Sequence, residues 1–191
     1  WVHIDMLLTL LILVAMGSAN RALERREPRW WAVSYLAMSL GCLAKGPVAL
    51  AIPAAGVFIF LASDRDLPRL KESRWWLGLP AALLPTLAWL QASSRSAGFD
   101  PAAVVSTQIL QRFQEGVHHP RPFYYYIYSL PLEFLPWTPF LAGALVATFP
   151  GLHGARRRPL LFLYGWVLGG LALFSLAAEK RPSYLLPLFP P

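Results

Sequence analysis

The feature that most constrains this chain is a series of apolar runs, each followed by a short charged or polar segment. A helix needs about 20 mostly apolar residues to cross a bilayer, and most of these runs approach that length. We therefore predict an all-α, polytopic transmembrane helical bundle with about six complete spans and part of a seventh. The complete runs cover about residues 4–19, 30–45, 47–62, 75–91, 123–149 and 160–178, and the last begins at Tyr184.

The composition excludes the other broad classes of protein. Apolar residues make up 56% of the chain and charged residues only 14%, whereas a soluble domain carries roughly 25% charged residues. So few charges cannot cover a water-soluble globule, and the many Trp, Phe and Leu residues exclude disorder. The single cysteine, Cys42, lies in an apolar run and is interpreted as a small packing residue.

The distribution of charge predicts the orientation of the spans. The segments after the first, third and fifth runs are short and basic, as in Arg156-Arg157-Arg158. Lysine and arginine collect in cytoplasmic loops, so these segments are predicted to be cytoplasmic and the others periplasmic. The net charge of +7 then reports topology, with membrane lipids and not nucleic acid as the partners.

The longest polar segment, residues 93–122, is predicted to be a periplasmic loop that carries an amphipathic helix. Asp100 and Pro101 suit the N-cap and the first position of a helix, and Gly116 can end it. Such a helix is too short to span a bilayer and is expected to lie on its surface. Its apolar residues recur every four positions at Val105, Ile109 and Phe113.

Basic residues on the periplasmic side are informative because the positive-inside rule predicts few of them there. Lys45, Arg112, Lys180 and Arg181 are the cations in question, and lysine and arginine are common phosphate ligands. The alternatives are a helix C-terminal cation or an interfacial anchor at Lys45, and a lipid-headgroup contact at Arg112. Asp5 opens the first run, either as an interfacial helix cap or as an acid that faces a polar cavity.

Two further groups of residues on this side leave alternatives open. His118 and His119 are adjacent, and two adjacent histidines cannot complete a metal site without other ligands. The aromatic, proline-rich stretch over residues 122–137 fits an interfacial belt with a kinked helix, or the lining of a lipid or sugar site. The chain shows no Walker loop, dinucleotide fingerprint, paired-cysteine site or nucleophile elbow.

Five short motifs, in this order along the chain, resemble one family. It is the GT-C type of membrane glycosyltransferase, and the likeness is nearest to lipid A aminoarabinose transferases and protein O-mannosyltransferases. The likeness runs through nearly the whole chain. The motifs are Val2-His3-Ile4-Asp5, Leu43-Ala44-Lys45-Gly46-Pro47, Arg112-Phe113 with His119-Pro120-Arg121-Pro122-Phe123-Tyr124-Tyr125, Leu135-Pro136-Trp137, and Lys180-Arg181-Pro182-Ser183-Tyr184-Leu185-Leu186-Pro187.

The resemblance implies a transferase that moves a hexosyl or pentosyl group from a polyprenyl-phosphate-linked sugar at the periplasmic face of a bacterial inner membrane. The acceptor would be lipid A, a protein or a glycan. Negative charge grows on the leaving phosphate, and fixed cations lower that barrier, which gives Lys45, Arg112, Lys180 and Arg181 a role. Asp5 would support catalysis, and His119 would bind a divalent metal ion. Tyr124, Tyr125 and Tyr184 would line the lipid or sugar.

One departure from the family pattern concerns the leading catalytic aspartate, which has no counterpart in this sequence. We therefore expect residues 1–191 to be an internal part of a single GT-C transmembrane domain, and to be inactive alone. The competing functions are a transporter or lipid flippase and a structural membrane subunit. A transporter would place polar groups near the middle of the membrane, where these runs have almost none. A structural subunit would tolerate substitution of Lys45 and Lys180.

Overall fold

The computed structural model describes residues 2–98, 100–106, 121–148, 150–154, 156–177, 180 and 182–190. Every regular element among these residues is a helix, so the all-α prediction is confirmed for them. In chain order the elements are α1 (Val2–Arg25), α2 (Pro28–Lys45), α3 (Val48–Ser63), η1 (Leu67–Ser73), α4 (Trp75–Ala97), α5 (Pro101–Val105), α7 (Tyr125–Glu133), α8 (Thr138–Thr148), η3 (Pro150–His153), α9 (Arg157–Leu176) and η4 (Pro182–Leu188).

Local sequence explains several of the helix boundaries. Pro28 stands at the start of α2 and Gly46, with φ of 89°, ends that helix, because proline fits a first helical position and glycine tolerates positive φ. Asp100 caps α5, and its carboxylate accepts a hydrogen bond from the Ala102 backbone N–H at 2.9 Å. This confirms the predicted helix start, whereas the predicted end at Gly116 lies outside the described residues.

The run over residues 123–149 differs from the single span that was expected. It forms two helices, α7 and α8, separated by a turn over residues 134–137 with a cis Leu135–Pro136 peptide bond. Pro136 cannot donate a backbone hydrogen bond and cannot continue a helix. The 11 residues of α8 are too few to cross a bilayer alone.

Length and hydropathy single out two of the described helices as long and apolar enough to cross a membrane. They are α1 over Ile4–Arg25 and α9 over Arg157–Leu176. Helices α3 and α8 are apolar but shorter, and α4 contains Pro80 and Pro85. The predicted number of spans therefore stays a prediction.

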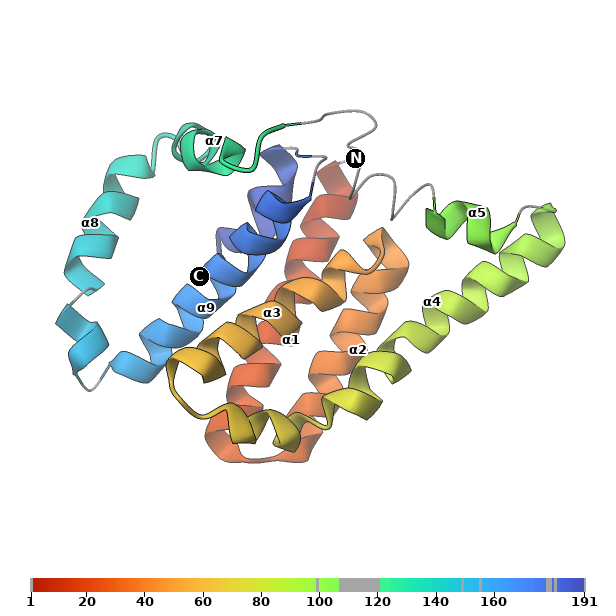
Figure 1. Cartoon of the computed structure of the whole chain (residues 1–191), viewed down its shortest axis with the longest axis horizontal. Helices are drawn as coiled ribbons and strands as arrows, with labels where there is room; N and C mark the ends of the chain where they lie inside the picture. The colour runs from red at the N-terminus through yellow and green to blue at the C-terminus, as the bar shows by residue number, and fades with distance from the viewer. Residues whose placement is uncertain are drawn as a thin grey trace.

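The core lies where α1 and α2 pack as an antiparallel pair and α3 crosses α9 (Figure 1). The α3–α9 crossing is close because glycines face each other there. A Cβ at Gly169 would lie 2.8 Å from the Gly56 backbone nitrogen, and one at Gly165 would lie 2.9 Å from the Gly56 oxygen. Fully buried apolar side chains fill the space around this crossing, among them Ile12, Met16, Ile52 and Leu61.

The helices place two chemically different ends on the molecule. The α1–α2 turn, η1 and the beginning of α9 share the lower end in Figure 1, with the basic segments. There Asp64 at the end of α3 accepts from Arg157 at 2.5 Å and Arg158 at 2.9 Å, which joins α3 to α9. The upper end holds the beginnings of α1 and α3 and the ends of α2 and α9. The basic segments are thus together at one end, as the topology argument expected.

Candidate functional site

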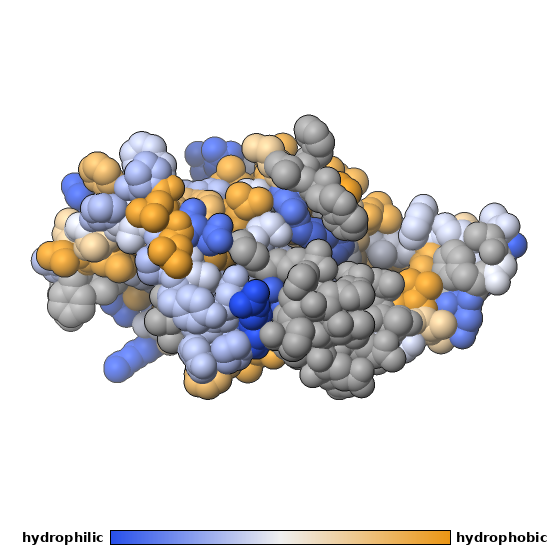
Figure 2. All heavy atoms as spheres, turned by 90° about the horizontal axis from the view of Figure 1, so that it is seen from above, coloured by the Kyte–Doolittle hydropathy of each residue, from blue (hydrophilic) through white to orange (hydrophobic). Residues whose placement is uncertain are grey.

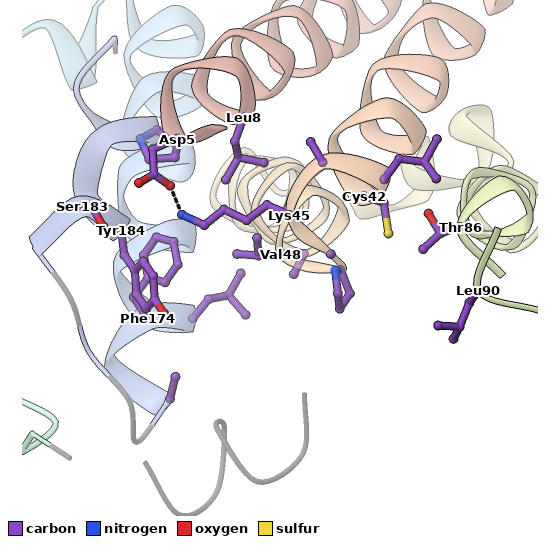
Figure 3. A pocket seen from close by; sticks show the side chains of 18 of the residues that line it. Asp5, Leu8, Cys42, Lys45, Val48, Thr86, Leu90, Phe174, Ser183 and Tyr184 are labelled. Atoms are coloured by element: carbon purple, nitrogen blue, oxygen red, sulfur yellow. Dashed lines mark hydrogen bonds and ion pairs between the residues drawn. The ribbon is translucent and has the colours of Figure 1, made fainter. Parts of the chain in front are cut away.

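A cavity of about 560 Å³ opens among α1, α2, α3, α4, α5, α9 and η4 near the upper end (Figure 3). Most of its wall is apolar, and apart from Thr86 its labelled polar side chains gather on one side. On the coloured part of the face seen from above in Figure 2, hydrophilic and hydrophobic residues are interspersed. The polar side is formed by Asp5, Lys45, Ser183 and Tyr184, and the apolar wall includes Leu8, Leu43, Val48, Trp89, Leu90, Val104, Leu173 and Phe174.

Asp5 and Lys45 form an ion pair at the polar side of the cavity (Figure 3). Asp5 lies in the first turn of α1 and Lys45 in the last turn of α2. Because the two helices pack antiparallel, these turns meet. A carboxylate at a helix N-terminus and a cation at a C-terminus are both favoured by the helix dipoles. The structure thus brings together two predicted site residues that are 40 positions apart in the sequence.

The aromatic ring of Tyr184 faces the ammonium group of Lys45. The Lys45 Nζ lies 5.4 Å from the centroid of the Tyr184 ring, a distance at which the ring face attracts a cation. The same ring stacks on Phe174 of α9, with centroids 5.4 Å apart and planes at 26°. A third predicted residue, which lies in η4, therefore joins the pair formed by α1 and α2.

Lys180 occupies a different position from Lys45, the other predicted cation that the structure describes. Its side chain is buried, with 3% of the residue exposed, and burial lowers the pKa of its ammonium group. The Nζ atom donates to the backbone carbonyl of Arg121 at 3.1 Å and to that of Ala177. Lys180 is not one of the described residues that line the cavity.

Tyr124 and Tyr125 also lie outside the described wall of the cavity. Tyr125 is buried and its ring faces the Arg121 guanidinium, with the Cζ atom 5.3 Å from the ring centroid. Tyr124 is about half exposed and packs edge-on against Phe123, with centroids 5.4 Å apart. The aromatic stretch thus begins α7 as a packed group next to the cavity wall.

Three predicted site residues cannot be compared with this geometry. Arg112, His119 and Arg181 lie outside the described residues. In the part of the chain that the structure describes, no three His, Cys, Asp or Glu side chains come together as a metal site would require. The divalent metal ion implied by the resemblance stays a prediction.

The sequence did not single out the residues of the apolar wall. Phe174 lies within an apolar run, and no motif around it distinguishes it from its neighbours. Trp89 and Leu90 come from the C-terminal half of α4. Thr86 also lines the cavity, and its buried hydroxyl oxygen has no hydrogen-bond partner among the described atoms. Only the fold-back of η4 against α9 and the packing of α2 beside α4 place these residues together.

Comparisons with known proteins bear on this site. Residues 1–91 match the family model described as dolichyl-phosphate-mannose-protein mannosyltransferase. A similar protein, named undecaprenyl phosphate-alpha-4-amino-4-deoxy-L-arabinose arabinosyl transferase, comes from Enterobacter sp. (strain 638). It is 33% identical over 98% of this chain and 34% of its own length. Its namesake from Pseudomonas aeruginosa (strain LESB58) is 32% identical over 95% of this chain and 33% of its own length.

The solved structures include a protein with the same fold. The crystal structure of ArnT from Cupriavidus metallidurans bound to undecaprenyl phosphate matches 98% of this chain and 34% of that chain, with a TM-score of 0.75 and 23% identity. This chain therefore spans about a third of the length of the relatives that it matches. The resemblance drawn from the sequence motifs is confirmed: the chain is similar to GT-C type membrane glycosyltransferases, and its fold matches that of about a third of the ArnT structure.

Proposed function

We propose that the protein is a membrane glycosyltransferase that moves a sugar from a polyprenyl-phosphate donor to lipid A, a protein or a glycan. The observation that carries this proposal is the Asp5–Lys45 pair over the Tyr184 ring, at the polar side of an otherwise apolar cavity. A polyprenyl-phosphate sugar has the same two-part character, because its phosphate and sugar are polar and its chain is apolar. The names of the similar proteins support this donor class.

The chemistry requires a cation near the leaving phosphate. The acceptor oxygen attacks the anomeric carbon, the bond from that carbon to the phosphate oxygen breaks, and the polyprenyl phosphate leaves with the electron pair. The proton of the acceptor passes to a base that these residues do not identify. We assign Lys45 to stabilise the growing phosphate charge, which a fixed cation does well in a water-poor site. Asp5 and Tyr184 orient the ammonium group.

We further propose a pentose donor, undecaprenyl phosphate-4-amino-4-deoxy-L-arabinose, in preference to a hexose donor. The support is the name of the similar proteins that cover 95–98% of this chain, whereas the mannosyltransferase family model matches only residues 1–91. The two donors differ in the sugar and share the phosphate. Lys45 serves both equally, so the choice has to be measured.

We also place the protein in a bacterial inner membrane, as a multi-pass protein with its active face in the periplasm. Large exposed apolar side chains on α4 and α8 support a lipid environment. Leu84 is 63% exposed and Val146 is 77% exposed, which would be unfavourable in water. The basic segments at the end opposite the cavity support the orientation, because such segments stay in the cytoplasm.

The test measures consumption of radiolabelled donor by the full-length protein in detergent. Undecaprenyl-phosphate aminoarabinose and polyprenyl-phosphate mannose are compared as donors, with lipid A as the first acceptor. We expect the aminoarabinose donor to be consumed, and Lys45→Ala to lower the rate about 100-fold or more, as loss of one transition-state contact does.

The matched control is Lys71→Ala, which removes an exposed lysine of η1 at the opposite end and should leave the rate unchanged. Equal rates for Lys45→Ala and the wild type would remove Lys45 from the site. If the protein instead moved the intact donor lipid across vesicle bilayers without breaking the sugar–phosphate bond, it would be a flippase. Consumption of the mannose donor alone would overturn the pentose assignment and retain the transferase.

A further inference from the structure

The ammonium group of Lys180 connects two segments that are far apart in the sequence. Lys180 lies between α9 and η4, and its Nζ donates to the carbonyl oxygen of Ala177, which caps the C-terminus of α9. It also donates to the carbonyl oxygen of Arg121 at 3.1 Å, 59 positions away and just before α7. One buried side chain therefore joins the end of α9 to the segment that leads into α7.

The partners of this ammonium group are unusual for a buried lysine. No carboxylate of the described residues lies within ion-pair distance of Lys180. Burying a charge is costly unless it is paired and hydrogen-bonded. The terminal carbonyls of a helix lack intrahelical partners and carry the negative end of its dipole. Ala177 thus supplies a favourable site for the cation, and the ammonium group can then hold the Arg121 carbonyl as well.

A continuous series of ring contacts leads from this junction to the polar side of the cavity. The Arg121 guanidinium covers Tyr125, and Tyr125 packs edge-on against Tyr126 with centroids 5.1 Å apart. The ring centroids of Tyr126 and Phe174 are 6.3 Å apart, and the Phe174 ring stacks on that of Tyr184. The Tyr184 ring lies beneath Lys45. A shift of the segment at Arg121 would therefore be transmitted to the ring that orients Lys45.

We propose that Lys180 is a positioning residue, which holds the beginning of α7 against the end of α9 and so keeps Tyr184 in place beneath Lys45. This inference rests on the proposed function for its effect on the donor, but the junction itself is independent of it. It gives Lys180 a task different from that of Lys45. Lys45 meets the donor phosphate, and Lys180 fixes the wall on which Lys45 is supported.

The test separates the junction from the activity. Arg121→Cys and Ala177→Cys are introduced together in the full-length protein, because both backbone carbonyls survive these changes. The rate of disulfide formation under mild oxidation is then compared for Lys180, Lys180→Met and Lys180→Arg. We expect Lys180→Met to slow the reaction at least about threefold and Lys180→Arg to restore it, since a guanidinium group also donates to carbonyls.

A second measurement uses undecaprenyl phosphate alone, in proteins without the added cysteines. We expect Lys180→Met to weaken its binding about tenfold and Lys180→Arg to recover most of the affinity. If Lys180→Met does not fold, Lys180→Gln, which keeps a neutral donor, takes its place in both measurements. An unchanged rate of disulfide formation with weakened binding would overturn the proposal and make Lys180 a phosphate ligand. Slowed disulfide formation in a protein that consumes no donor would support the junction and refute the proposed function.

Discussion

The crossing of α3 and α9 depends on the absence of side chains at three glycines, and Gly169→Ala tests this directly. The new Cβ would lie 2.8 Å from the backbone nitrogen of Gly56 and 3.0 Å from the carbonyl carbon of Ala55. Ordinary van der Waals contact begins near 3.4 Å, so the Cβ would be about 0.6 Å too close. These neighbours are backbone atoms, which cannot rotate away as a flexible side chain can. The helices themselves must therefore separate.

Two opposing effects decide the size of the change in stability. Extra volume in a well-packed core costs about 1–3 kcal/mol, and overlap with backbone atoms places this substitution in the upper part of that range. Replacing glycine by alanine inside a helix stabilises the folded state by about 1 kcal/mol. We therefore expect a net loss of about 1–2 kcal/mol in the free energy of unfolding, which is roughly a 5- to 30-fold shift in the folded-to-unfolded ratio.

The assay is reversible unfolding of the full-length protein in mixed detergent micelles, followed by tryptophan fluorescence. Gly17→Ala in α1 is the matched control, because Gly17 is exposed and its Cβ would meet no atom within 4 Å. We expect that control to be neutral or to stabilise by up to about 1 kcal/mol. If Gly169→Ala were as stable as Gly17→Ala, the close crossing of α3 and α9 would be refuted.

Three other predictions concern charged groups. Asp64→Asn should lower the free energy of unfolding by about 1–2 kcal/mol, because Asp64 is nearly buried while its partners Arg157 and Arg158 are 41% and 52% exposed and partly screened. The same unfolding assay checks this, and an effect no larger than that of Asp66→Asn would contradict it. Burial lowers the pKa of Lys180, so its cation is lost at a lower pH than that of an ordinary lysine. Affinity for undecaprenyl phosphate, titrated from about pH 7 to 10, should fall on the alkaline side in the wild type and persist in Lys180→Arg, and identical profiles would contradict this. Removal of divalent metal with a chelator should reduce transfer, His119→Ala should reproduce that loss, and transfer that resists chelation would remove the metal from the mechanism.

The order of the helices could be predicted from the sequence, because burial in a membrane or a core requires apolar runs and charge interrupts them. Runs 30–45 and 47–62 agree with α2 and α3 to within about two residues. Gly46 and Pro47 end one helix and begin the next through their own backbone restrictions. The run over 123–149 was harder, because hydropathy is continuous through Pro136 while the backbone is not.

Part of the candidate site could also be predicted from the sequence. Asp5 and Lys45 stand at helix ends where charges are otherwise scarce, and Tyr184 follows a basic, proline-containing hinge. Of these residues, Lys45 is of a type that binds anions such as phosphate. Whether they meet depends on how α1, α2 and η4 pack, and no spacing along the chain encodes a contact between positions 5, 45 and 184.

The sequence by itself determined the helical class and the boundaries of α2 and α3, and it predicted the chemical kind of the site, since these follow from hydropathy, backbone restrictions and charge within short segments. Only the tertiary structure decided which cation faces the cavity. Lys45 and Lys180 are both lysines at helix ends, but one lies in the cavity wall beside Asp5 and the other is buried on two carbonyls. That difference arises from long-range packing, because Asp5 lies 40 positions from Lys45 and Arg121 lies 59 positions from Lys180.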